Sequence, residues 1–277
     1  MRRWKPYREP LWTELPGGGF HPFGLRARKA EVLHRLADFP ALERLCRVDL
    51  ERGRGDDRVV GFCLMKLGTL AAQHGDLDSG RFQLETALEL MRRTGDSENA
   101  FVCRTALVNV SILQRRFSEA ELAAAEMASE AESAGNLKAL ASVLNLQGLA
   151  AMKQGLHQRA LSFFGRKLEL ARSLGLMVDQ AMAMGNIGQV YLKQKRFSEA
   201  ATVIRESLDL CRRIGDLYSA YCVLYTLGEA YQGQGNLEEA ERCFREDLEM
   251  ARQLGDGPGE KDILRIIAGL QGKNAGS

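Results

Sequence analysis

The chain has 277 residues, of which 45% are hydrophobic and 27% charged, and its formal net charge is +2. This composition is ordinary for a folded, water-soluble protein, and the small net charge disfavours a nucleic-acid binder. The apolar runs are far shorter than the roughly 18 residues of a membrane span, and no hydrophobic signal-peptide segment follows the basic start MRRWKPYR.

The six cysteines form no recognisable ligand set. They lie at positions 46, 63, 103, 211, 222 and 243, with no CxxC pair and no histidine at the spacing of a zinc site. Small thiols of this kind pack well inside helical proteins. We therefore expect buried, reduced cysteines in a cytoplasmic protein that holds no metal and no cofactor.

Proline divides the sequence into two parts. Five of the six prolines lie at positions 6, 10, 16, 22 and 40, and the last is Pro258. A proline inside a helix costs about 3 kcal/mol, and residues 41–257 contain none. The sequence therefore predicts an irregular N-terminal arm over residues 1–25, followed by a long helical body.

The arm combines aromatic and basic side chains. Trp4, Tyr7 and Trp12 are interleaved with arginines and a lysine, and both tryptophans of the protein lie here. Aromatic residues and arginine are enriched where interfaces bind most strongly. We expect Trp4, Tyr7 and Trp12 to dock onto a partner or a large assembly; the alternative is that the arm folds back over the first helices. The prolines argue against an amphipathic mitochondrial presequence.

Glycine recurs every forty residues through the helical body. Four of the six glycines in this series precede an aspartate, and one precedes an asparagine. Glycine ends a helix in the left-handed conformation without a steric penalty, and Asp or Asn can cap the next helix. Each step therefore predicts a helix end and a helix start. The series consists of Gly55, Gly95, Gly135, Gly175, Gly215 and Gly255.

Other positions share this period and predict how two helices pack. Glycines recur at 68, 148, 188 and 228, with Val108 as the exception, and alanines recur at 120, 160, 200 and 240. Small residues at these positions let two antiparallel helices approach closely. Large apolar residues at 84, 164, 204 and 244, with leucines four residues later, give the second helix one buried face. Each copy is predicted to be helix A, a short turn, helix B and a glycine stop.

The two ends of the array differ from its middle. Residues 58–257 hold five copies of forty residues, and residues 26–57 read as a degenerate copy that caps the first. Residues 258–277 supply one more apolar helix and a short tail. We expect this helix to cover the fifth copy, because terminal repeats must bury their outer face.

The order Leu-Gly, Tyr, Ala, Phe within a copy resembles the tetratricopeptide repeat. Tyr191 and Tyr231 occupy the aromatic position of that family, whereas Ala71, Ser111 and Ala151 depart from it. The usual repeat has about 34 residues. The forty-residue period is similar to the subclass that contains LGN/Pins, rapsyn and the bacterial Rap-type peptide receptors. The resemblance implies an all-α fold, a right-handed α-solenoid.

The resemblance also implies a concave wall lined by the A helices, where such proteins hold a peptide or a helix. Side-chain amides there can hydrogen-bond an extended backbone, and lysines can attract acidic groups. The alternative is that these side chains are solvated or bridge neighbouring repeats. The candidate partner-binding residues are Asn109, Asn145, Lys153, Asn186, Gln189, Lys193, Tyr225 and Glu229.

Nothing in the sequence assembles a catalytic site. The four histidines share no face, and the glycines at 17–19 lack the strand and the lysine of a phosphate loop. The positions of the basic clamp found in chaperone adaptors carry no basic residue. We predict a non-enzymatic adaptor that binds a protein segment and supports assembly of a larger complex, cytoskeletal or ciliary by family analogy. The alternative is a regulatory peptide sensor that changes conformation on binding.

Overall fold

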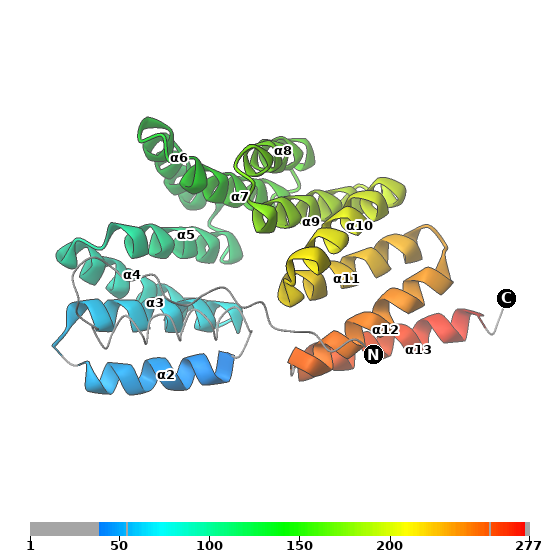
Figure 1. Cartoon of the computed structure of the whole chain (residues 1–277), viewed down its shortest axis with the longest axis horizontal. Coiled ribbons are helices and arrows are strands. Elements are labelled where there is room, and N and C mark those ends of the chain that lie inside the picture. The colour runs from blue at the N-terminus through cyan, green and yellow to red at the C-terminus, as the bar shows by residue number, and fades with distance from the viewer. Residues whose placement is uncertain (1–38, 54, 255, 275–277) are drawn as a thin grey trace.

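The computed structural model describes residues 39–274 except residues 54 and 255 (Figure 1). The predicted arm, with Trp4, Tyr7 and Trp12, lies outside the described residues, as does the first helix of the predicted capping copy. All regular structure in the described part is α-helical. The helices are α2 (Phe39–Arg52), α3 (Asp57–Gln73), α4 (Leu77–Thr94), α5 (Ser97–Leu113), α6 (Phe117–Ser133), α7 (Leu137–Lys153), α8 (His157–Ser173), α9 (Met177–Lys193), α10 (Phe197–Ile214), α11 (Leu217–Gly233), α12 (Leu237–Leu254) and α13 (Gly257–Asn274).

Glycines with positive φ separate successive hairpins. Gly95 closes α4 with a φ of 71°, and the Asp96 side chain accepts a hydrogen bond of 3.1 Å from the Asn99 N–H at the start of α5. Asn136 and Asp216 cap α7 and α11 in the same way. These contacts confirm the predicted signal of a glycine stop followed by a polar cap.

Within a hairpin, helix A presents a glycine to a large side chain of helix B. A Cβ atom at Gly148 would lie 2.4 Å from the Phe164 ring, and one at Gly188 would lie 2.2 Å from Ile204. Phe164 and Ile204 are fully buried. Only glycine allows these helices to approach so closely, so this register reflects packing and not binding.

The second hairpin, α5 with α6, exchanges its large and small residues. Val108 stands where the other four copies have glycine, and Ala124 stands where they have leucine, phenylalanine or isoleucine; both are buried. The helices α5 and α6 pack along a shorter stretch than the helices of the other four hairpins. The second hairpin is therefore the most open of the five.

The hairpins stack into a curved array. Each B helix packs against the A helix of its own hairpin and against the A helix of the next. Adjacent A helices also touch, as α5 does α7 and α9 does α11, whereas no comparable packing joins adjacent B helices in the described part. Because the A helices lie closer together, the stack curves with these helices inside. The fold is the predicted right-handed α-solenoid, which Figure 1 shows as an arc from α2 to α13.

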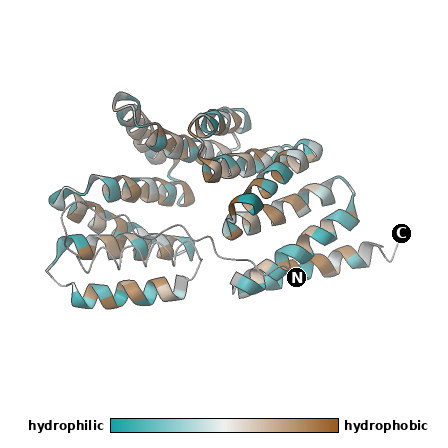
Figure 2. Cartoon of the chain, in the orientation of Figure 1, coloured by the Kyte–Doolittle hydropathy of each residue, from teal (hydrophilic) through white to brown (hydrophobic). Residues whose placement is uncertain are grey.

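Helices α2 and α13 cover the two ends of the described stack. Ile263, Ile267 and Leu270 of α13 are buried against Phe244 of α12, and Leu42 of α2 is buried against α3. Figure 2 shows hydrophobic and hydrophilic residues interspersed along the helices. None of the described helices is long and apolar enough to cross a membrane.

Candidate functional site

The inner face of the arc is the side of α3, α5, α7, α9 and α11 that faces no B helix. We call this surface the inner face throughout. Apolar side chains of these helices stay exposed at Val102 and Met182, each 41% exposed, and at Tyr225, which is 37% exposed.

The structure places the predicted binding residues on α5, α7, α9 and α11. Among them, it brings only Asn145 and Asn186 into a direct hydrogen bond with each other. The half-buried ones are Asn145, Asn186 and Gln189, and the exposed ones are Asn109, Lys153, Lys193, Tyr225 and Glu229.

Asn145 and Asn186 face each other across adjacent hairpins. The Asn186 Nδ2 donates to Asn145 Oδ1 over 2.9 Å, and Lys167 Nζ donates to the same oxygen over 3.3 Å. Lys167 is 1% exposed and also pairs with Asp179 Oδ1 at 3.1 Å. Burial lowers the pKa of Lys167, and the Asp179 carboxylate opposes that shift. The buried Lys167, paired with the half-buried Asp179, therefore holds the asparagine pair from the core side.

The asparagine pair keeps one donor and one acceptor without a partner in the described part of the chain. Asn145 Oδ1 accepts both bonds, so the Asn145 Nδ2 group donates to no described residue, and Asn186 Oδ1 accepts from none. A peptide unit carries one N–H and one C=O group. The pair therefore presents the two groups that complement a peptide backbone.

The α11 end of the inner face is aromatic and acidic. The Tyr225 ring packs edge-on against Phe244, with 5.7 Å between the ring centroids and 71° between the planes. Glu229 lies one helical turn further along α11. Desolvation by the surrounding protein raises the pKa of Glu229, and the charge of Lys193 on α9 opposes the shift.

A buried carboxyl group lies behind this end of the inner face. Asp247 of α12 is 1% exposed, and neither of its oxygens has a hydrogen-bond donor among the described residues. Desolvation, with the charges of Asp256 and Glu246 adding to it, raises the pKa of Asp247 to about 7. The Asp247 charge also raises the pKa of Tyr225, which places the carboxyl group within electrostatic reach of the inner face.

A pocket of about 480 Å³ lies between α4, α5 and α6, at the opening of the second hairpin. Its lining is mainly charged and comes from three helices, so the pocket is a second candidate binding site. The charged lining residues are Arg81, Arg92, Arg104, Glu85, Glu119, Glu126 and Glu130.

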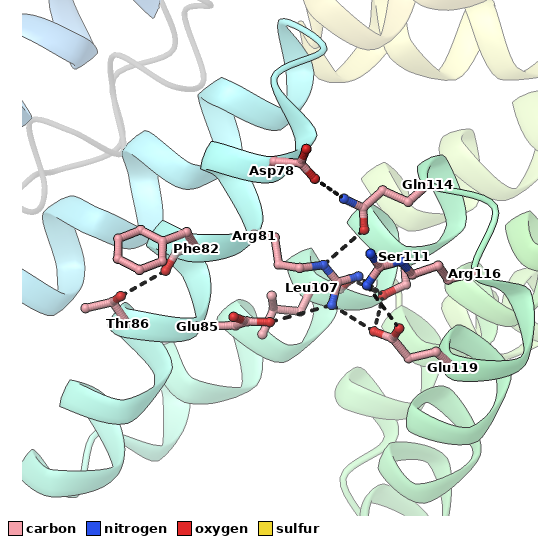
Figure 3. Close-up of polar contacts among 10 residues, drawn as sticks. All are labelled: Asp78, Arg81, Phe82, Glu85, Thr86, Leu107, Ser111, Gln114, Arg116 and Glu119. Atoms are coloured by element: carbon pink, nitrogen blue, oxygen red, sulfur yellow. Dashed lines mark hydrogen bonds and ion pairs between the residues drawn. The ribbon is translucent and has the colours of Figure 1, made fainter.

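Arg81 occupies this pocket with all three of its side-chain nitrogens bonded (Figure 3). Its Nε donates to Gln114 Oε1 over 3.0 Å, its Nη1 to Glu119 Oε1 over 2.8 Å and its Nη2 to Ser111 Oγ over 2.8 Å. The hydrogen bonds from Arg81 and Ser111 lower the pKa of Glu119. We call this group the Arg81 clip. Its polar groups satisfy one another, so the clip joins the first two hairpins.

The same contacts recur forty residues later with the charges reversed. Glu121, the counterpart of Arg81, accepts hydrogen bonds from Gln154 over 3.0 Å and from Arg159 over 3.2 Å. Sequence reasoning missed both clips because it compared apolar positions only. The sequence does contain a signal for these contacts. Positions 81 and 119 carry opposite charges, and so do the equivalent positions 121 and 159 in the next copy.

Cysteine placement corrects one expectation. Five of the six thiols are buried, as expected, but Cys222 is exposed. It belongs to a register of helix A that faces no B helix, so the inner face leaves it uncovered. No cluster of three metal-binding side chains occurs within the described residues.

The fold and its inner face define an α-solenoid of stacked helical hairpins. Two family models, both described as tetratricopeptide repeat, match residues 139–213 and 222–254. The chain is a tetratricopeptide repeat protein. Repeats of this family generally serve as interaction modules.

Solved structures share the fold at low sequence identity. NprR in complex with its cognate peptide NprX matches with a TM-score of 0.69 and 16% identity, over 90% of this chain and 73% of that one. A Rap protein complexed with competence and sporulation factor matches with a TM-score of 0.64 and 12% identity, over 90% and 75%. No curated protein sequence matches the chain.

A third match is a signal-transduction ATPase of the STAND class with a tetratricopeptide repeat sensor, from Pyrococcus horikoshii. Its TM-score is 0.63 and its identity 15%. The match covers 87% of this chain and 36% of the ATPase chain. At these identities the likeness shows the fold alone.

Proposed function

We propose that the chain binds a peptide or helical segment of another protein along its inner face and acts as an adaptor in a larger complex. The observation that carries the proposal is the Asn145–Asn186 pair. It presents a donor and an acceptor on adjacent hairpins, and Lys167 holds it in place from the core side. Groups fixed before binding lose little conformational entropy when the partner arrives.

The side chains around the pair favour a segment with apolar and acidic positions. Val102 of α5 and Met182 of α9, which lies one helical turn before Asn186, are exposed and can receive apolar side chains. Lys153 and Lys193 are exposed at the ends of α7 and α9 and supply positive charge. An extended segment would therefore bind through its backbone at the asparagines and through its side chains on both sides. A cytoskeletal or ciliary complex is the proposed setting, by family analogy.

A regulatory peptide sensor is the second candidate function. The observation in its favour is that NprR and a Rap protein, both of this fold, were solved with the cognate peptide NprX and with competence and sporulation factor, respectively. A sensor requires binding to change the shape of the solenoid. Small-angle scattering distinguishes the two: compaction on adding a binding peptide supports the sensor, and an unchanged profile supports the adaptor.

The test of binding begins with a displayed library of random peptides selected on the full chain. The variant Asn145→Ala with Asn186→Ala should bind the selected peptides roughly tenfold or more weakly, since two or more hydrogen bonds of about 0.5–1.5 kcal/mol each are lost. The matched control, Gln158→Ala with Ser162→Ala, changes two exposed residues of α8 and should bind as the unmodified chain does. Equal affinities for both variants, or no selected peptide at all, would contradict the proposal.

A further inference from the structure

Asp247 belongs to a buried register of the B helices. The polar side chains at the other steps of this register have partners: Lys167 pairs with Asp179, and Ser207 donates to the Ala181 carbonyl over 2.8 Å. Neither oxygen of Asp247 has a hydrogen-bond donor in the described part of the chain. A buried polar group without a partner costs free energy and requires an explanation. All five members of the register are buried: Ala87, Met127, Lys167, Ser207 and Asp247.

The charged groups that act on Asp247 are acidic. Asp256, which caps α13, and Glu246, on α12 itself, both disfavour its ionised form, and no described lysine or arginine favours it. From α11, the ionisable groups that face it are Tyr221, Cys222 and Tyr225, whose pKa values its charge raises. From α13, Asp262 acts on Tyr225 as well. The site is therefore a buried negative potential that the described chain leaves without a cation.

Three side chains of α11 lie within electrostatic reach of this carboxyl group, namely Tyr221, Cys222 and Tyr225. Tyr221, Cys222 and Tyr225 lie on little more than one turn of α11, and Cys222 and Tyr225 are exposed. Access to Asp247 from the inner face requires these exposed side chains to change rotamer, a motion that exposed residues undergo rapidly. The Tyr225 ring also offers a π face to an incoming cation.

We propose that Asp247 anchors a lysine or arginine side chain of the segment that binds along the inner face. The inference rests on the proposed function and adds a chemical requirement to it, since the partner must carry a basic residue at the α11 end. A neutral ligand would leave the carboxylate unpaired, and a metal ion would need further ligands that the described residues do not gather there. A basic side chain supplies both the charge and the hydrogen bonds that Asp247 lacks.

The step is a proton exchange. In the free chain the carboxyl group is largely protonated below neutral pH, because its pKa is about 7. When the cationic side chain arrives, the Asp247 O–H bond breaks, the proton leaves to the buffer, and the carboxylate pairs with the ammonium or guanidinium group. Binding therefore releases protons in proportion to the protonated fraction.

The anchor also gives the bound segment a direction. Lys153 and Lys193 at the ends of α7 and α9 attract acidic groups, whereas Asp247 behind α11 attracts a basic one. A segment with acidic residues before or after a basic residue can satisfy both regions in one orientation only. The order of charge in the partner sequence therefore sets the polarity of binding.

The experiment uses the displayed peptide library on the full chain and on two variants. Asp247→Asn keeps the volume of the side chain and removes its charge, and thermal melting confirms that it folds. Asp209→Asn, an exposed position of α10, is the matched control. We expect the selected peptides to share a lysine or arginine, to lose about 30-fold in affinity for Asp247→Asn, and to bind Asp209→Asn unchanged.

Titration calorimetry of one selected peptide in phosphate and in imidazole buffer at about pH 6 measures proton release. The unmodified chain should release close to one proton, and Asp247→Asn none. Peptides that depend on Asn145 and Asn186 but share no basic residue and bind Asp247→Asn equally would overturn the anchor and leave the proposed function standing. If no selected peptide depends on the asparagines, the proposed function fails, and the anchor fails with it.

Discussion

Asp247 keeps its carboxyl group in a buried site where no described residue donates a hydrogen bond to it, so its protonation contributes to the pH dependence of folding. Its pKa rises from the ordinary 3.8 to about 7. A carboxyl group whose pKa is higher in the folded chain binds more protons there. It therefore favours the folded state at low pH, and this contribution is lost as the pH rises from about 4 to about 7.

We predict that Asp247→Asn removes this dependence. The unmodified chain should lose about 1.4 kcal/mol of stability between pH 6 and pH 8, whereas the variant should show a flat profile over that range and be the more stable chain at pH 8. Urea unfolding followed by circular dichroism at the two pH values measures the difference. Parallel profiles for the two chains would show that the carboxyl group titrates elsewhere.

The candidate site could be predicted from the sequence only in part. The forty-residue register selected Asn145 and Asn186 as candidates, but it gave no reason for them to touch. Asn145 also accepts a hydrogen bond from Lys167, a residue in a buried register whose burial could not be expected from its chemistry. Asp247 was missed for the same reason, because a charged residue in a core register contradicts the pattern that reveals the core.

At the scale of helices, the Arg81 clip joins α4 of the first hairpin to both helices of the second hairpin, whose own contact is the least extensive of the five. Arg81 of α4 is 16% exposed and reaches Ser111 of α5 and Glu119 of α6. The clip spans the opening of the second hairpin, where Val108 replaces a glycine. Polar contacts here compensate for apolar contact that the exchanged residues do not make.

We predict that Arg81→Glu destabilises the chain by about 1–3 kcal/mol, because Glu119 then faces a like charge and the hydrogen bonds of Arg81 are lost. Adding Glu119→Arg should restore much of the stability, since the next junction already uses Glu121 with Arg159. Thermal melts at low and high salt measure both effects.

An exposed ion pair gives the control for this experiment. Arg47 and Glu43 pair on the surface of α2, with the Arg47 side chain 69% exposed. Arg47→Glu should change stability by only about 0.5 kcal/mol or less. If the double variant, Arg81→Glu with Glu119→Arg, is no more stable than Arg81→Glu alone, the prediction is wrong. The clip would then require the geometry of an arginine at position 81, and a pair of opposite charges in either order would not be enough.

The helices themselves were the most predictable level of the structure. Gly95 with Asp96 contains both the stop and the start of a helix, so the local sequence was sufficient. The openness of the second hairpin was not predicted, although Val108 was recognised as an exception. The effect of Val108 on the packing depends on Ala124, which lies opposite it in α6. Comparing one position at a time between copies does not show that the larger residue at 108 and the smaller residue at 124 compensate for each other.

At the scale of the whole molecule, α13 ends the described solenoid and covers its last B helix. Ile263, Ile267 and Leu270 are buried in this interface, and each such side chain contributes about 1.5–3 kcal/mol when fully buried. Without α13 the apolar surface around Phe244 would face water.

We predict that deleting residues 257–277 lowers the melting temperature and promotes aggregation, because a repeat array needs a covered end. Deleting residues 275–277 alone should leave the melting temperature unchanged and serves as the control. Differential scanning fluorimetry and size-exclusion chromatography measure the two properties. A monomeric, equally stable truncated chain would show that α13 has no capping role.

The order of stacking has a mechanical consequence. Within the described residues, each helix packs mainly against its neighbours along the chain, so α2 and α13 are connected through the interfaces between them. Tension applied to the two ends is therefore carried in series, and every interface bears the same load. The interface between α5 and α6 is the least extensive of the five within hairpins, so it yields first under load. Under force, we therefore expect the second hairpin to open before the other four.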